Sequence, residues 1–266
     1  RPRRHRLAGP RKDTALPAPF LRRVAARPDR LPAVPAYPFT LPWFGPEFEL
    51  DFDEPVTILV GENGAGKSTL VEALAALAGY DPAGGGKGYR PVDHATALES
   101  SGAGLAEALR GGWLPKVTDG WFFRAESFFS VARYLDASAR ESGGAPPDFL
   151  SHSHGEGFLR FFDERVQRQG IYFLDEPESA LSPRRQLDLL RLLADIQQGA
   201  RAQVVMATHS PILMAVPGAA LLEVSRGGFR RVDLGDTAHF RLYRAFCADP
   251  EGFARSAAEG DADMLF

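Results

Sequence analysis

The residues best suited to chemistry lie in a glycine-rich segment in the first third of the chain. The segment fits the spacing G-x-x-x-x-G-K-[ST], and we call it the P-loop; its residues are Gly61, Glu62, Asn63, Gly64, Ala65, Gly66, Lys67, Ser68 and Thr69. Glycines let backbone N–H groups curl around phosphate oxygens, and a lysine at this spacing reaches the β and γ phosphates. We therefore expect the P-loop to bind a nucleotide, with Lys67 on the phosphates and Ser68 on Mg²⁺. The alternative is a plain glycine-rich turn between a strand and a helix.

Two adjacent carboxylates form a second candidate site. The apolar run from Ile171 to Leu174 is typical of a buried strand, and Asp175 and Glu176 follow it directly. Ligands of open α/β sheets lie at the carboxyl ends of the strands. We predict that Asp175 binds Mg²⁺ and that Glu176 is the general base for water attacking the γ-phosphate. By itself, an Asp-Glu pair in this position is more often a polar turn.

A histidine follows a third apolar run. Val204 to Met206 predict a strand, and residues 207–211 read Ala-Thr-His-Ser-Pro. A histidine at the end of a strand can sense a γ-phosphate or position the attacking water. We therefore expect His209 to act in catalysis; the alternative is an ordinary half-buried histidine.

The elements that must position these residues alternate between strands and helices. Strands are expected at 48–52, 57–60, 120–124, 171–174, 203–207, 220–224 and 229–232, and helices at 67–79, 96–110, 126–136, 156–169, 183–198 and 236–248. Residues after 248 are weakly specified. This order predicts an α/β fold with a mostly parallel sheet and an antiparallel edge.

The charge of the chain is distributed unevenly. The net charge is −3, yet residues 1–30 carry nine Arg and one Lys against Asp13 and Asp29, a balance of +8. We expect 1–36 to be a basic, proline-rich extension in which the prolines disfavour helix and sheet. Residues 37–266 would be the nucleotide-binding domain, with 80–150 as a helical or inserted lobe. The extension could bind nucleic acid or a protein, or lie along its own acidic domain.

Composition excludes several other classes of protein. A single cysteine, Cys247, rules out a disulfide framework and a cysteine-rich zinc site. No apolar run approaches the ~18 residues that a membrane span needs. We expect a cytoplasmic protein.

Taken in order, the motifs resemble the core of ABC-type ATPases. They are the P-loop, Leu-Asp-Glu-Pro-Glu at 174–178, Ser-Ala-Leu-Ser at 179–182 and Thr-His-Ser-Pro at 208–211. The likeness is greatest to small stand-alone ATPases of the ABC/AAA kind, over residues 37–246. It implies a three-layer P-loop NTPase sandwich, ATP and Mg²⁺ as ligands, ATP hydrolysis, and a homodimer that encloses two nucleotides head to tail.

The resemblance also assigns roles to individual residues. His209 would be the switch histidine, and residues 179–182 the loop at the dimer interface. Residues 151–156 stand where the family has its signature Leu-Ser-Gly-Gly-Gln, so Ser153 and Gly155 would reach the γ-phosphate held by the partner. The segment 151–156 departs from that signature because it has histidines where the signature has glycine. Ser153 with Glu156 also fits a helix capping box. The family's glutamine loop has no clear counterpart, and Glu126 is expected to face the metal instead.

The sequence says less about the process that ATP hydrolysis drives than about the hydrolysis itself. We predict a soluble switch or motor for which a membrane partner is unlikely. One alternative is the ATP-binding subunit of a membrane transporter, and the altered signature argues against it. Another is a non-hydrolysing nucleotide sensor; the intact Asp175–Glu176 pair argues against it, because a sensor has no need of the base.

Overall fold

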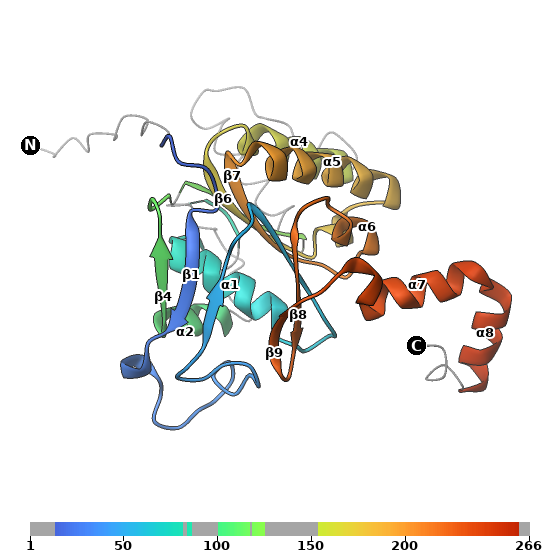
Figure 1. Ribbon diagram of the computed structural model, residues 1–266, viewed down its shortest axis with the longest axis horizontal. Helices are drawn as coiled ribbons and strands as arrows, with labels where there is room; N and C mark the ends of the chain where they lie inside the picture. Colours follow the sequence, from blue (N-terminus) through green and yellow to red (C-terminus); the bar gives the residue numbers. More distant parts are fainter. Residues whose placement is uncertain (1–13, 82–83, 87–100, 118, 126–153, 261–266) are drawn as a thin grey trace, which may run out of the picture.

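A six-stranded, mostly parallel sheet forms the centre of the protein (Figure 1). The computed structural model describes residues 14–81, 84–86, 101–117, 119–125 and 154–260. In spatial order the strands are β5 (Gly120–Arg124), β6 (Gly170–Asp175), β7 (Ala202–Ala207), β3 (Val56–Val60), β8 (Ala220–Ser225) and β9 (Gly228–Arg231). The first five strands run parallel, and β9 pairs antiparallel with β8. The predicted parallel sheet and its antiparallel edge are confirmed.

Helices cover both faces of this sheet, which explains why its central strands are continuously apolar. Every residue of β3, β6 and β7 is buried, as expected for a sheet with no solvent-facing side. One face packs against α1 (Lys67–Ala78), and the other against α4 (His154–Val166) and α5 (Pro183–Gly199). Successive residues of β6 alternate between the two cores, with Phe173 in one and Leu174 in the other. The result is the expected three-layer sandwich.

A smaller antiparallel sheet packs on the α1 side of the molecule, and it corrects two predictions. Its order is β2 (Glu49–Asp51), β1 (Leu21–Ala26) and β4 (Leu109–Trp113). The expectation that the proline-rich N-terminal stretch disfavours sheet is wrong for β1. The helix expected at 96–110 is wrong at its end, because α2 (Ser101–Glu107) stops at Glu107 and β4 begins at Leu109; residues 96–100 lie outside the described part of the chain.

Buried hydrogen bonds explain why β1 forms despite its flanking prolines. The side chain of Gln203 in β7 accepts hydrogen bonds from the backbone N–H groups of Phe20 and Leu21, both at 2.8 Å. The same amide donates to the carbonyl of Leu21 at 2.9 Å. One side chain of the large sheet thus fixes where the N-terminal strand enters the fold. Residues 14–36 therefore contribute a strand, while the domain division at residue 36 stays a prediction.

The C-terminal part forms helices that extend away from the sheets (Figure 1). Short α6 (Pro211–Met214) precedes β8, and α7 (Ala238–Ala248) is followed by α8 (Pro250–Glu259). Single 3₁₀ turns occupy η1 (Pro28–Arg30), η2 (Pro177–Ala180) and η3 (Leu234–Asp236). The sequence left the region after 248 weakly specified, but Asp249 caps α8 and Pro250 begins it. Among the described residues, no helix is long and apolar enough to cross a membrane.

Candidate nucleotide-binding site

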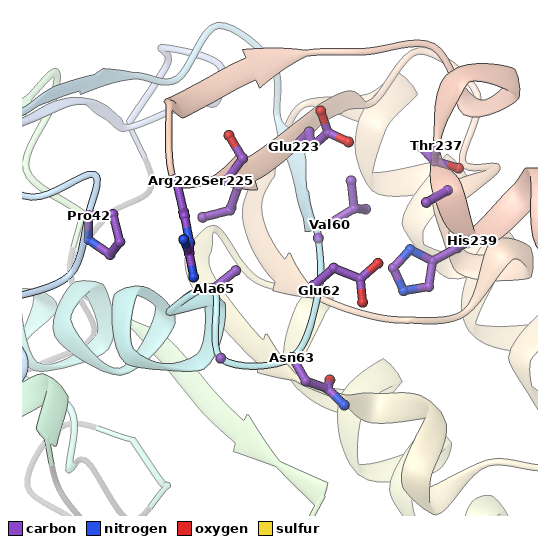
Figure 2. Close-up of a pocket in the computed structure, with 14 residues that line it drawn as sticks. Pro42, Val60, Glu62, Asn63, Ala65, Glu223, Ser225, Arg226, Thr237 and His239 are labelled. Atoms are coloured by element: carbon purple, nitrogen blue, oxygen red, sulfur yellow. The ribbon is translucent and has the colours of Figure 1, made fainter. Parts of the chain in front are cut away.

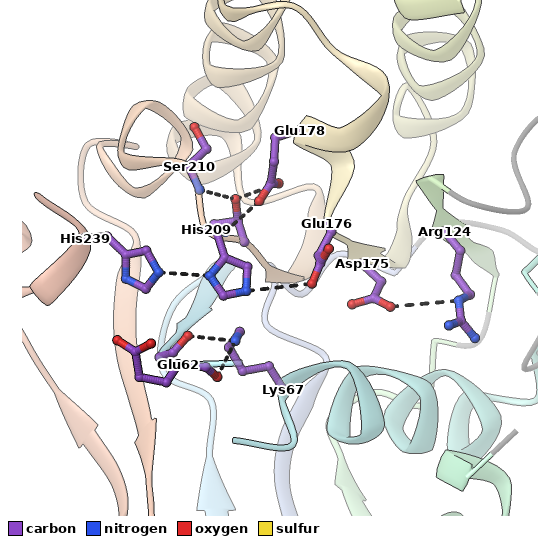
Figure 3. A network of polar contacts seen from close by, with 11 residues as sticks. Glu62, Lys67, Arg124, Asp175, Glu176, Glu178, His209, Ser210 and His239 are labelled. Atoms are coloured by element: carbon purple, nitrogen blue, oxygen red, sulfur yellow. Dashed lines mark hydrogen bonds and ion pairs between the residues drawn. The ribbon is translucent and has the colours of Figure 1, made fainter. Parts of the chain in front are cut away.

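The P-loop joins β3 to α1 and closes around the ammonium group of Lys67. Lys67 is only 4% exposed, and its Nζ donates to the carbonyls of Gly61 at 2.7 Å and Glu62 at 3.0 Å (Figure 3). Glycine is required at Gly61, where φ is +141° and a Cβ would lie 2.4 Å from the carbonyl oxygen of Val224. The lysine is therefore held inside the loop, at the place where phosphates would bind.

Burial strengthens the interaction of the Lys67 ammonium group with a bound anion. It lowers the pKa of Lys67, while the charges of Glu176 and Asp175 oppose the shift. An ammonium group with little water around it interacts more strongly with an anion than an exposed one does. A phosphate that displaced the two carbonyls would gain that interaction.

Aromatic residues ahead of β3 support the P-loop from outside. Trp43 Nε1 donates to the carbonyl of Ala65 at 2.7 Å, and the ring of Trp43 packs on Phe229 of β9 with centroids 5.2 Å apart. The hydroxyl groups of Tyr37 and Thr69 lie 2.5 Å apart. Sequence analysis did not predict that these aromatic residues hold the loop.

Asp175 lies at the end of β6, next to the loop. Its carboxylate is buried and the residue is 7% exposed. Burial raises the pKa of Asp175 to about 6, while a side-chain hydrogen bond with Ser68 and the charge of Arg124 oppose the shift. Among the described residues, Asp175 Oδ1 has no hydrogen-bond partner. The structure thus brings together Ser68 and Asp175, the two predicted metal ligands, and leaves one buried carboxylate oxygen available.

This donor set fits Mg²⁺ bound together with a nucleotide. Mg²⁺ in phosphoryl-transfer sites takes one or two carboxylates, phosphate oxygens and water rather than a cage of protein ligands. The described residues hold no cluster of three or more His, Cys, Asp or Glu that could bind a metal alone. A cation at Asp175 would therefore take phosphate oxygens and water as its remaining ligands.

Glu176 has an unusual backbone conformation. Its φ is +48° and its ψ is +53°, in the left-handed region that costs a non-glycine residue roughly 1–2 kcal/mol. Its N–H donates to the carbonyl of Ala207 at 3.0 Å, and Pro177 follows it. This turn leaves the carboxylate half-exposed at the mouth of the site, with Oε1 3.7 Å from His209 Nε2. Non-glycine residues in this conformation are enriched at functional sites.

A carboxylate that sequence reasoning missed anchors the predicted histidine. Glu178 in η2 accepts hydrogen bonds from the hydroxyl of Thr208 at 2.7 Å and from the backbone N–H of His209 at 2.6 Å (Figure 3). Burial raises the pKa of Glu178, and these two hydrogen bonds oppose the shift. They tie the segment after β6 to the segment after β7. The second Glu of Leu-Asp-Glu-Pro-Glu was the available signal.

Arg124 occupies the place next to Asp175 at the end of β5. Its guanidinium pairs with Glu72 of α1 at 2.8 Å and lies 3.8 Å from Asp175. Glu126 and Ser153 lie outside the described residues, and Gly155 is the second residue of α4. The roles expected for these three therefore stay predictions.

A pocket of about 460 Å³ opens beside the P-loop on its β8 side (Figure 2). Its walls are the first part of the P-loop (Gly61–Ala65), the end of β8 with the following turn (Glu223–Arg226), and the start of α7 (Thr237–His239), together with Pro42 and Val60. This volume is in the range of small-molecule sites. Asp175 and Glu176 lie on the other side of the loop, beyond β7.

Comparison with known proteins gives matches over the same segments. An AAA domain family matches residues 43–108, and a second AAA domain family, whose description names the AbiEii toxin of a type IV TA system, matches residues 158–215. The thiamine import ATP-binding protein ThiQ of Vibrio cholerae is 30% identical over 65% of this chain and 76% of its own length. The cytochrome c biogenesis ATP-binding export protein CcmA of Rhodopseudomonas palustris is 33% identical over 59% of this chain and 79% of its own.

Solved structures include weaker likenesses. CbiO1 from Clostridium perfringens, part of the ABC transporter complex CbiONQ, aligns with 14% identity over 87% of this chain and 96% of that one, at a TM-score of 0.45.

Proposed function

The chain belongs to the ABC/AAA-type family of P-loop ATPases, and on that basis we propose that it binds Mg²⁺–ATP and hydrolyses it as a head-to-tail homodimer. The observation that carries this proposal is the convergence of groups from three neighbouring strands. Lys67 follows β3, Asp175 ends β6 and Glu176 comes directly after it, and His209 follows β7. Separate parts of the chain thus bring phosphate-binding, metal-binding and base chemistry to one edge of the sheet.

The residues present divide the work of phosphoryl transfer among them. Backbone N–H groups of the P-loop and Lys67 would neutralise phosphate oxygens, and Ser68 with Asp175 would hold Mg²⁺. Bound Mg²⁺ supplies charge neutralisation at the phosphates. Glu176 would accept a proton from the attacking water, which can reach its half-exposed carboxylate. His209 would contact the γ-phosphate beside it.

The pocket beside the P-loop is the place on this chain for the nucleoside. It begins at the loop residues that would wrap the phosphates and extends away from the carboxylates. This arrangement would keep the γ-phosphate near Glu176 while the ribose and base lie toward β8 and α7.

Exposed residues beside the site support a second copy as the partner. Ser179 and Ser182 are exposed on the segment directly after Glu176, where the family places its dimer contact. The partner's Ser153 and Gly155 would complete the site from the opposite side. Light scattering of the Glu176→Gln variant should show a monomer that becomes a dimer with ATP and Mg²⁺; a monomer in saturating nucleotide would contradict the dimer.

Hydrolysis is tested by the same variant with a matched control. Glu176→Gln should lower turnover by about 100-fold or more while it retains ATP binding. Glu251→Gln removes an exposed carboxylate in α8 and should leave turnover at the parent rate. Equal turnover in the Glu176→Gln variant and the parent would remove Glu176 as the base, and no turnover in the parent would favour a nucleotide sensor.

The process that hydrolysis drives has two candidates. A soluble switch or motor remains our first proposal. The names of the matched relatives, an import and an export ATP-binding protein, favour a transporter subunit as the second, and they do not support the expectation that a membrane partner is unlikely. Association of the tagged chain with membranes that is lost on detergent extraction would favour the transporter subunit.

A nucleic-acid partner for the basic N-terminal stretch gains no support from its described part. Arg23 pairs with Glu49 at 2.8 Å and with Asp51 at 2.6 Å, on the neighbouring strand β2. Arg27 lies 3.4 Å from Asp29. The Arg23 pairs support the alternative that the extension lies along its own domain, while Asp29 belongs to the extension itself. DNA-stimulated turnover with a steep salt dependence would restore the nucleic-acid proposal.

A further inference from the structure

Two histidines from distant parts of the chain meet beside the proposed catalytic site. His209 Nδ1 and His239 Nε2 are 2.9 Å apart, and the ring centroids are 5.0 Å apart (Figure 3). His239 lies in the first turn of α7, whose cap residue Thr237 accepts a hydrogen bond from the N–H of Phe240. None of the sequence motifs predicted a role for His239.

The contact constrains which nitrogen of each ring carries a proton. A hydrogen bond between two neutral imidazoles has one donor and one acceptor, so either His209 Nδ1 or His239 Nε2 must be protonated. Two arrangements are therefore compatible with the distance alone, and the surroundings of the remaining nitrogen decide between them.

The other nitrogen of His209 faces the catalytic groups. His209 Nε2 is buried, has no hydrogen-bond partner among the described residues, and lies 3.7 Å from Glu176 Oε1. A γ-phosphate at Lys67 would add a second anionic acceptor on this side. Both acceptors favour a proton on Nε2. A neutral His209 with that proton must accept at Nδ1, which makes His239 the donor.

Burial of the pair favours the neutral form of both rings. Burial lowers the pKa of His209 and of His239. The charge of Lys67 lowers the pKa of His209 further, while Glu176 and Glu62 oppose that shift. The pKa of His239 is lowered by His209 and Lys67, while Glu62 and Glu178 oppose the shift. The position of His239 in the first turn of α7 also disfavours a positive charge.

We propose that His239 is a positioning residue that donates its Nε2–H to His209 Nδ1 and so fixes His209 as the tautomer whose Nε2–H faces the γ-phosphate. The role rests on the proposed function, because it acts on the ATPase through His209. Glu178 anchors the backbone N–H of His209, and His239 orients its ring. Together they determine where Nε2 lies.

Kinetics of three variants test this role. His239→Phe keeps a ring in α7 but removes the donor, and it should lower kcat about tenfold. His239→Gln places an amide N–H near the same position and should restore kcat to within about threefold of the parent. Arg244→Ala, an exposed change in the same helix, should match the parent.

A double-variant cycle separates positioning from general destabilisation. If His239 acts through His209, then His239→Phe should have no further effect on kcat in a His209→Ala background. An additional tenfold loss there would overturn the proposal, as would parent-like kcat in His239→Phe alone.

Histidine NMR decides the tautomer without any need for turnover. The chain has six histidines, and the two single variants assign the signals. In ¹⁵N-labelled full-length protein at pH 7.5, His209 should show a protonated Nε2 and an unprotonated, hydrogen-bonded Nδ1. A protonated Nδ1 on His209 would overturn the inference. If the parent hydrolyses no ATP, the proposed function fails while this spectrum still decides the contact.

Discussion

Replacing Asp175 by Asn should stabilise the protein while it abolishes the proposed metal site. Burial raises the pKa of Asp175 from 3.8 to about 6. Below about pH 4 the carboxyl is protonated in both the folded and the unfolded chain, so it contributes no difference. Between about pH 4 and 6 the unfolded chain ionises first, and the free energy of unfolding falls as the pH rises.

The size of this effect follows from the shift. Because the pKa rises from 3.8 to about 6 and each pKa unit corresponds to 1.36 kcal/mol, the free energy of unfolding is about 3 kcal/mol lower above pH 6 than below pH 4. Asparagine has nearly the same shape and no charge, so Asp175→Asn should be about 3 kcal/mol more stable than the parent at pH 8. The difference should shrink toward zero as the pH falls from 6 to 4.

Urea unfolding followed by tryptophan fluorescence measures this difference. Titrations at pH 5, 6.5 and 8 in EDTA would compare the parent, Asp175→Asn and the control Asp53→Asn, which changes an exposed carboxylate. Mg²⁺–ATP should then raise the stability of the parent but not that of Asp175→Asn. A variant no more stable than the parent at pH 8, or a gain that does not change with pH, would refute the reasoning.

Variants at two further residues test other parts of the site. Lys67→Ala removes the ammonium that the P-loop encloses, and calorimetry should show ATP affinity about 100-fold lower or more, since charge-assisted contacts to phosphate are lost; parent-like affinity would remove the P-loop as the phosphate site. Glu178→Ala leaves the Thr208 hydroxyl and the His209 N–H unpaired, which should cost about 2–4 kcal/mol of unfolding free energy in urea. Glu178→Gln keeps an acceptor and should cost less than half of that; equal losses would show that the two hydrogen bonds are not responsible.

The sequence predicted the main sheet because its strands carry a strong signal. Residues 171–174 and 204–207 are apolar runs too continuous for a half-exposed strand, and each is followed by residues suited to chemistry. Parallel strands bring their carboxyl ends to one edge, so Lys67, Asp175, Glu176 and His209 could be expected to meet. The structure places them together.

Other features depend on contacts that one sequence does not reveal. β1 forms within a proline-rich stretch because the side chain of Gln203, more than 180 residues away, bonds its entry. The left-handed backbone of Glu176 also has no sequence signal, because no glycine marks it. Both Glu178 and His239 reach His209 across about 30 residues of sequence through folded geometry alone.

A structure of the Glu176→Gln variant with ATP and Mg²⁺ is the most direct test of the proposed site. We predict that Lys67 Nζ leaves the carbonyls of Gly61 and Glu62 and contacts the β and γ phosphates, with the metal between Ser68 and Asp175. Phosphates bound away from the P-loop, with Lys67 still on its carbonyls, would contradict the account.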